Sequence, residues 1–298
     1  MRRAVPGFDV TAPEVHLVRV FAASQTGGNP APVVLHADGL SSDAMRGIAA
    51  REGLESAFVL RPEQPGNSLR LRFFVPNHEM EMCGHATLGA LWLLRSLGTW
   101  TSDVAQIETP SGIVLARVDP DSGRIEISQP EGRVAPVAET ELVRATLAAL
   151  GLDKEELQFG GIVNAATSRT KTLIGLRTCD RLHGLKPKFD AIETLCDALG
   201  STGLYPFAIE SDRPLRLQAR QFPRSSGYPE DAATGIAAAA LLYGAFHYGI
   251  VKEPAEAVIV HQGFAMGSPS EIELRFRNPA DPSQGCWLSG AVELMKKD

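Results

Sequence analysis

Two segments of the chain are apolar on almost every side of a predicted helix. They cover residues 85–97, which include ATLGALWLLRSL, and residues 232–246, AATGIAAAALLYGAF. A helix that is apolar all round must be surrounded by protein. We therefore expect each helix to run through the middle of its own curved sheet. A membrane helix or a partner-binding helix is the alternative, but both runs are shorter than the roughly 18 residues that a membrane span needs.

Shorter apolar segments alternate with polar residues or are rich in β-branched residues, as strands are. In the first part of the chain this pattern predicts strands at 16–22, 31–36, 56–61 and 69–76, and a helix at 41–53 that is capped at or near Ser42. In the second part it predicts strands at 170–176, 204–210 and 216–223, and a helix at 188–200. The expected fold class is α+β with mainly antiparallel strands.

The same order of elements occurs twice along the chain. Phe74 and Phe222, and likewise Cys83 and Asp231, are 148 positions apart (222 − 74 and 231 − 83). Similar offsets recur on both sides, at 149 for ESAFVL and LYPFAI and at 151 for TPSG and VHQG. Any two apolar helices that follow strands look alike, but the collinear flanks favour an internal duplication. We expect halves at 14–133 and 134–285, with a strand at 286–296 as a candidate addition to the first.

Composition and charge narrow the class of protein. The chain has 298 residues, of which 44% are hydrophobic and 21% charged, as in an ordinary globular protein. Its net charge is -6 and its basic residues are scattered, so we expect no nucleic-acid partner. The N-terminal sequence MRRAVPGFDVTAP is interrupted before any apolar signal region, which makes the cytoplasm the expected compartment.

The four cysteines, Cys83, Cys179, Cys196 and Cys286, lie far apart and form no CxxC pair. This spacing indicates neither a zinc ribbon nor a disulfide framework. Most of them are expected to be reduced core residues.

Both long helices are expected to begin at a polar cluster. Cys83, Gly84 and His85 open the first helix, and the segment 230–235, which contains Asp231, opens the second. The free N–H groups and the positive dipole end of a helix attract an anion. Two such starts that face one cleft would bind a substrate carboxylate. Alternatively Asp231 is an ordinary N-cap, Cys83 a small core residue and His85 a helix-start histidine, although capping explains neither the thiol nor the imidazole.

A metal site was the other interpretation of the first cluster, because His78, Glu79, Glu81, Cys83 and His85 lie within eight positions. In a strand, Glu79, Glu81 and Cys83 would point to one face. The sequence has no HExxH, no CxxC and no second cluster with ligand spacing, so no metal is expected.

Glu55 is a carboxylate at the mouth of an apolar strand, between Leu54 and Ala57. It is either a solvated glutamate at a helix end, as Glu52 is expected to be, or a half-desolvated acid. Desolvation would raise its pKa toward the working pH and suit it to carry a proton in both directions.

Five motifs, in this order, resemble those of the PhzF-like family, isomerases of the diaminopimelate epimerase superfold. They are VFAASQTGGNPAPVVL, ESAFVL, RFFVPNHEMEMCGHATLGA, YPEDAATGIAAAAL and VHQGFAMGSPSEIEL, and they span almost the whole chain. The resemblance implies two pseudo-symmetric halves, each a β-barrel-like sheet around a central helix, with the active site between them. It also implies a homodimer.

The resemblance further implies cofactor-free isomerisation of a small carboxylate. The family's glutamate falls on Glu55, its histidine on His85 and its aspartate on Asp231. Glu55 is then the expected proton shuttle, and the other two orient or protonate the substrate. The residues expected to bind the substrate are Asn29, Cys83, Gly84, Ala233, Thr234 and Gly235.

Two further interpretations stay open at the level of sequence. Epimerases of this superfold use two cysteines, one at each helix start, whereas this chain has Cys83 at the first start and Asp231 at the second. Epimerisation by a pair of thiols is therefore disfavoured, while an epimerase or racemase in which Cys83 is paired with Asp231 or Glu55 stays open. The last alternative is a small-molecule binding protein that kept the fold and lost the chemistry.

Overall fold

A computed structural model describes residues 13–295 of the chain. Residues 1–12, which hold most of the segment examined for a secretory signal, and position 296 of the expected last strand lie outside the described residues. Within the described part, none of the helices is long and apolar enough to cross a membrane.

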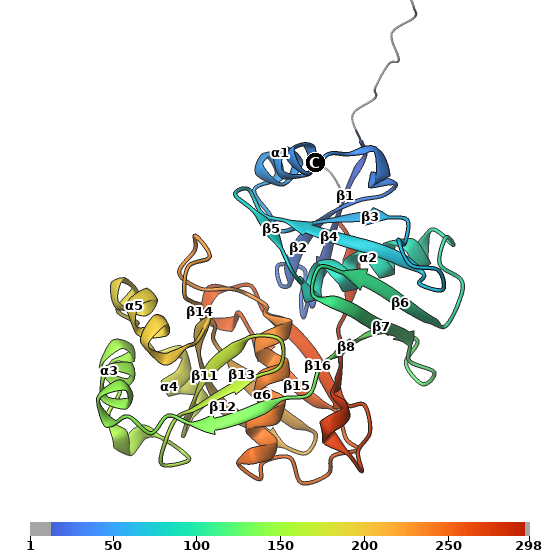
Figure 1. The fold of residues 1–298 in the computed structure, drawn as a ribbon. Coiled ribbons are helices and arrows are strands. Elements are labelled where there is room, and N and C mark those ends of the chain that lie inside the picture. The colour runs from blue at the N-terminus through green and yellow to red at the C-terminus, as the bar shows by residue number, and fades with distance from the viewer. Residues whose placement is uncertain (1–12, 296–298) are drawn as a thin grey trace, which may run out of the picture.

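The first half of the chain contains two helices and a set of short strands (Figure 1). The helices are α1 (Ser42–Glu52) and α2 (Gly84–Ser96). The strands are β1 (Val15–Val20), β2 (Asn29–Val34), β3 (Ser56–Leu60), β4 (Leu69–Phe74), β5 (Glu79–Met80), β6 (Val104–Thr109), β7 (Gly112–Val118) and β8 (Ile125–Gln129).

The second half repeats this plan and adds helices that the sequence pattern did not predict. The helices are α3 (Thr140–Leu150), α4 (Cys179–His183), α5 (Phe189–Leu199) and α6 (Gly235–His247), of which α3 and α4 were unexpected. The strands are β9 (Arg133–Pro136), β10 (Val163–Ala166), β11 (Thr170–Leu176), β12 (Gly203–Asp212), β13 (Leu215–Ala219), β14 (Phe222–Pro223), β15 (Val258–Gln262), β16 (Ser270–Phe276), β17 (Cys286–Ser289) and β18 (Val292–Leu294).

Strand pairing confirms the expected duplication and fold class. In the first half the order is β18-β1-β2-β3-β4-β6-β7-β8, and in the second it is β9-β10-β11-β12-β13-β15-β16-β17. The parallel pairs occupy equivalent places, β2–β3 and β4–β6 in one half and β11–β12 and β13–β15 in the other. The other pairings between the described strands are antiparallel, so the sheet is mainly antiparallel.

The last strands of the two halves hold the halves together. β8 pairs antiparallel with β17, with Ile127 opposite Leu288. The chain then crosses over after each of them, because β9 joins β10 in the second half and β18 joins β1 in the first. One continuous sheet results, and the division at 133/134 and 285/286 therefore stays a prediction.

The two central helices lie inside their sheets as their apolar sequences require. α2 contacts β1, β2, β3 and β8, and α6 contacts β9, β10, β11 and β16. A single apolar core that includes Leu88, Leu91, Ala238 and Leu241 runs through both halves. A second core lies between the outer helices α3 to α5 and the sheet of the second half.

The helix starts differ from the expected ones by up to three residues. The first long helix begins at Gly84, after Cys83 as N-cap, but the second begins at Gly235, with Thr234 and not Asp231 as N-cap. Cys83 is therefore equivalent to Thr234, at an offset of 151 (234 − 83). The expected offset of 148 at this point was wrong, because the loop between β14 and α6 is longer than its counterpart between β4 and α2. The cap of α1 is Ser41, whose hydroxyl accepts from the N–H of Ala44, one residue before the expected Ser42.

Candidate active site

Three side chains meet at the start of α2. α1 ends at Gly53, whose φ of 68° lies in the left-handed region that favours glycine, and the chain then turns into β3 through Glu55. The Cys83 Sγ donates to Glu55 Oε2 at 3.2 Å and lies 3.4 Å from His85 Nδ1. His85 Nδ1 is itself 3.8 Å from the same carboxylate oxygen. Glu55 is thus held against a thiol and an imidazole, with 27% of its side chain exposed.

The start of α6 is organised by hydrogen bonds around Asp231. The Thr234 hydroxyl donates to the Asp231 carboxylate, and the Asn29 amide donates to it at 3.3 Å from the first half of the chain. The buried Gln262 donates to the Asp231 carbonyl at 2.7 Å and to Thr234 Oγ1 at 3.2 Å. Tyr205 fixes Gln262 in turn, because its hydroxyl donates to Gln262 Oε1 at 2.7 Å. Asp231 therefore sits in a network that fixes its orientation.

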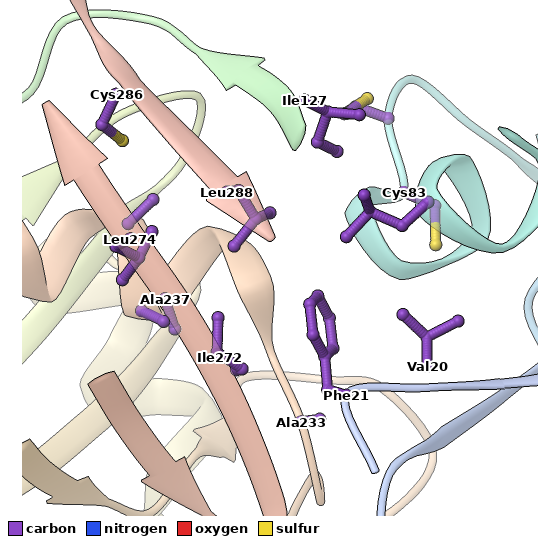
Figure 2. Packing of buried hydrophobic residues seen from close by; sticks show 14 of the residues in the cluster. Val20, Phe21, Cys83, Ile127, Ala233, Ala237, Ile272, Leu274, Cys286 and Leu288 are labelled. Carbon is purple, nitrogen blue, oxygen red and sulfur yellow. The ribbon is translucent and has the colours of Figure 1, made fainter. Parts of the chain in front are cut away.

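The two helix starts approach each other across an apolar seam (Figure 2). Leu288 of β17 and Phe21 lie between them, and Ile127 of β8 lies nearby. A Cβ atom on Gly84 would be 3.3 Å from Leu288 Cδ2, and one on Gly235 would be 2.8 Å from it. Glycine at both first positions lets the helix backbones approach the same leucine.

Neither of the two central helices is capped by the side chain of its N-cap residue. The N-cap side chain makes no capping hydrogen bond at Cys83 or at Thr234, whereas Ser41 and Thr178 cap α1 and α4. The first N–H groups of a helix have no partner within the helix. Two uncapped starts at one place are suited to bind an anion.

A cavity of about 130 Å³ lies over these groups. The expected residues that line it are Glu55, Cys83, Gly84, His85, Asp231, Ala233, Thr234 and Gly235. An adjoining outer cavity shares Glu55 and Asp231 and is lined by Asn29, the remaining expected residue. The structure therefore brings all the expected site residues together, although their roles stay predictions.

Burial raises the pKa of two of these groups. The pKa of the Cys83 thiol is raised well above its usual value, first by desolvation and then by the charge of Glu55. Cys83 is therefore a neutral thiol at neutral pH. Desolvation also raises the pKa of Asp231, and the hydrogen bond from Thr234 opposes this shift.

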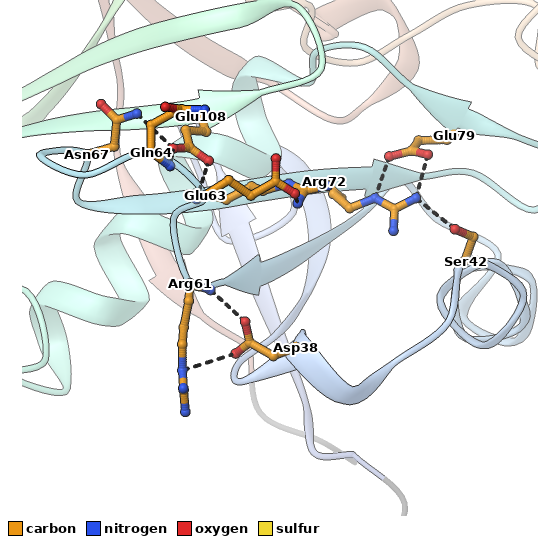
Figure 3. A network of polar contacts seen from close by, with 10 residues as sticks. Asp38, Ser42, Arg61, Glu63, Gln64, Asn67, Arg72, Glu79 and Glu108 are labelled. Atoms are coloured by element: carbon orange, nitrogen blue, oxygen red, sulfur yellow. Dashed lines mark hydrogen bonds and ion pairs between the residues drawn. The ribbon is translucent and has the colours of Figure 1, made fainter.

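The metal-ligand group that the structure contains differs from the one weighed from the sequence. Among residues 13–295, the ligand atoms of Glu55, Cys83 and His85 lie within 4.8 Å of one another. Glu79, in contrast, accepts from Arg72 at 2.7 and 2.6 Å, and Arg72 also donates to Ser42 (Figure 3). Glu79 is thus engaged on the outside of the sheet. The positive ends of two helix dipoles oppose a cation at the cavity.

Several residues of the cavity were not predicted from the sequence. Most come from the second half, among them Arg169, Lys171, Thr202, Gln221 and Tyr228, while Met80 and Met82 come from the first. The one available signal was the lysine inside the β-branched strand sequence SRTKTLIGL, because a charged residue in a buried strand needs a reason. Gln262, which orients Asp231, gave no signal of its own.

Comparison with known proteins agrees with this architecture. Residues 18–296 match the family PhzC-PhzF, described as phenazine biosynthesis-like protein. An uncharacterized isomerase of Deinococcus radiodurans is 32% identical over 274 residues, 89% of this chain and 87% of that protein. A trans-2,3-dihydro-3-hydroxyanthranilate isomerase of Pseudomonas chlororaphis is 28% identical and covers 92% of this chain and 94% of its own.

Solved structures share the fold. A phenazine biosynthesis protein of the PhzF family from Bacillus anthracis superposes with a TM-score of 0.81 at 25% identity, over 95% of this chain and 96% of its own. A probable proline racemase from Agrobacterium radiobacter K84 superposes with a TM-score of 0.59 at 12% identity, over 95% and 92%. The second likeness concerns the fold alone.

Proposed function

This chain belongs to the PhzC-PhzF family of phenazine biosynthesis-like proteins and is an isomerase of that family, and we propose that it moves a proton along a small carboxylate without a cofactor. The observation that carries this proposal is the position of Glu55. Its carboxylate lies against Cys83 and His85 and lines a cavity that also contains Asp231 and two uncapped helix starts.

In the proposed reaction, Glu55 takes a proton from a carbon next to an activating group. The electron pair of the broken C–H bond moves into the conjugated system of the substrate, and its negative charge falls on oxygen. Glu55 then returns the proton to another carbon, so the composition of the substrate is unchanged. The N–H groups of the helix starts support this charge, because they are oriented before the reaction begins.

His85 and Asp231 serve in this proposal as orienting or proton-donating groups. Asp231 is suited to donate, because burial raises its pKa and favours the protonated acid. Asn29, Thr234 and Gln262 hold it in place. Cys83 is a hydrogen-bond donor to Glu55 rather than a base, because its raised pKa keeps the thiol protonated.

The alternative of an epimerase or racemase with Cys83 as one of two bases finds less support, because the raised pKa of Cys83 keeps its thiol protonated. The position equivalent to Cys83 at the start of α6 is Thr234, whose hydroxyl is bonded to Asp231. The second half therefore offers no thiol at its helix start.

The test is hydrogen exchange between substrate and solvent. Wild-type protein in deuterated water should incorporate deuterium into one acid of a panel of small unsaturated carboxylates that includes trans-2,3-dihydro-3-hydroxyanthranilate, measured by NMR. Replacement of Glu55 by Gln should lower this rate by about 1000-fold, as expected for loss of a general acid-base residue.

Glu81→Gln is the matched control, because Glu81 is an exposed carboxylate two residues before Cys83. It should exchange at the wild-type rate. If Glu55→Gln also exchanged at the wild-type rate, the shuttle assignment would be wrong. Tight binding of one acid with no exchange by wild-type protein would instead support a binding protein.

A further inference from the structure

Lys171 is a buried cation that the proposed reaction does not use. It lies on β11, its residue is 6% exposed, and it lines the cavity that contains Glu55 and Asp231. Its ammonium group donates to the Thr202 carbonyl, at 3.4 Å, and to no other group of the described residues. Among residues 13–295, no carboxylate oxygen lies within 4.0 Å of it. An ammonium group has three donors, and burial of an unpaired charge is unfavourable.

Gln221 is a second polar group at the same wall without a partner. It is 1% exposed and lines the same cavity. Neither its amide nitrogen nor its amide oxygen has a hydrogen-bond partner among the described residues. The amide lies against Gly203, where a Cβ atom would be 2.2 Å from Gln221 Nε2. Gly203 follows Thr202, whose carbonyl accepts from Lys171. The Gln221 amide and the Lys171 ammonium therefore lie against neighbouring residues of the backbone.

We propose that Lys171 and Gln221 bind a second acidic group of the substrate, so that this site takes a small dicarboxylate or an equivalent dianion. The inference rests on the proposed function, because it assigns a substrate class to the same cavity. Each helix start contributes roughly half a positive charge, so the pair together balances about one carboxylate. The helix starts thus balance the first carboxylate, while the Lys171 ammonium has no carboxylate oxygen within 4.0 Å among the described residues. A second anion in contact with it would satisfy both the ammonium and an N–H of the amide.

The charges around Lys171 define the pH range of this interaction. Asp231, Glu55, Arg169 and Cys196 face it, and desolvation lowers its pKa to about 8. Lys171 is therefore charged at neutral pH and loses its charge as the pH rises through about 8. Binding of the second acid should weaken over the same range.

The experiment compares two acids of equal chain length, succinate with two carboxylates and butyrate with one, by isothermal titration calorimetry. Wild-type protein should bind succinate about tenfold more tightly than butyrate at neutral pH. This preference should shrink at a pH of about 9, where the lysine is neutral. Succinate binding no tighter than that of butyrate to wild-type protein would overturn the proposal.

Variants test whether the preference for succinate over butyrate depends on Lys171 and Gln221. Lys171→Met should remove most of it, and Gln221→Leu should reduce it. Lys186→Met, which changes an exposed lysine outside the cavity, should keep it. Retention of the preference by Lys171→Met would overturn the proposal. Thermal unfolding of each variant checks that it folds, and replacement of a buried ion by an apolar side chain is often neutral or stabilising.

The preference for succinate can be tested separately from the role of Glu55 in proton transfer. Glu55→Gln should keep the preference for succinate even where it abolishes exchange. Loss of exchange in Glu55→Gln with no preference for succinate in wild-type protein would retain the proposed function and reject the dianion.

Discussion

The starts of α2 and α6 are equivalent places in a duplicated fold, and they differ in how their polar groups are held. Both begin with glycine, lack a capping side chain and approach Leu288. At α2 the polar groups are a carboxylate, a thiol and an imidazole, which contact one another. At α6 they are a carboxyl, a hydroxyl and amides in a closed network of hydrogen bonds.

This difference indicates a division of work between the halves. A group that carries a proton must change its bonding during the reaction, so a closed network would hinder it. A group that orients the substrate benefits from being fixed before the substrate arrives. The first half is thus suited to transfer and the second to positioning.

The largest expected effect that tests this difference between the halves is the loss of exchange on replacement of Asp231. Replacement of Asp231 by Asn keeps the size of the side chain and removes its acid, and we expect exchange to fall by about 100-fold, as for loss of one oriented donor. That loss is about tenfold smaller than the one expected for Glu55→Gln. The measurement is the same deuterium exchange.

Equal losses in the two variants would mean that Asp231 and Glu55 share the proton transfer. In that case the two halves would not divide the work. A pH profile of the exchange rate separates the cases, because a shared transfer gives two essential ionisations.

A smaller effect concerns Gln262, which connects Tyr205 to the start of α6. At the end of the equivalent strand in the first half, β6, the Thr109 hydroxyl donates to the nearby Gly112 carbonyl at 2.8 Å. Gln262→Leu should lower the free energy of unfolding by about 2 kcal/mol, because it leaves the buried Tyr205 hydroxyl without a partner. Urea denaturation measures this change.

The matched variant in the first half is Thr109→Val. It should lower the free energy of unfolding by under about 1 kcal/mol, because the Thr109 hydroxyl and its partner lie near solvent. If both variants lowered the free energy of unfolding by the same amount, the hydrogen-bond network at α6 would contribute no more to stability than the Thr109 hydrogen bond.

The smallest expected effect is a difference in stability between alanine substitutions at Gly235 and at Gly84. Gly235→Ala should lower the free energy of unfolding by about 1 kcal/mol, because the new methyl group lies within contact distance of Leu288 and the leucine must move. Gly84→Ala should be nearly neutral, since its Cβ would be 3.3 Å from the same atom and not 2.8 Å. Thermal unfolding checks both. A larger cost at Gly84 would show that the seam is tighter on the side of α2.

Much of the fold could be predicted because its signals are local. The all-round apolar sequences of α2 and α6 require burial, and the repeated order of strands requires two similar sheets. α3 was missed because it joins β9 to β10, whose counterparts β18 and β1 are not consecutive in the sequence. α4 was missed because only a short 3-10 helix, Ala37–Gly39, lies at the equivalent place in the first half. The start of α6 was misplaced because Asp231 is a good N-cap by residue type, while its side chain is used in the network with Thr234.

Site residues that belong to a local sequence motif could be predicted, whereas those brought to the cavity by the sheet topology could not. Cys83 and His85 stand together in the sequence, and Glu55 follows a helix end. Lys171 lies on β11 and Gln221 directly before β14, and both reach the cavity because these segments belong to one curved sheet. The local sequence around either residue does not predict that they lie close together. Burial without partners is a property of the folded molecule alone.

The crossing of the terminal strands also has a consequence for how the protein is made. β18, at residues 292–294, supplies the partner that β1 lacks on its outer edge, with Val18 opposite Leu294. During synthesis the first half emerges early, yet this edge stays unpaired until residues 292–294 have been made. An exposed edge strand invites wrong partners, so ribosome-bound chains that stall before this point are open to aggregation.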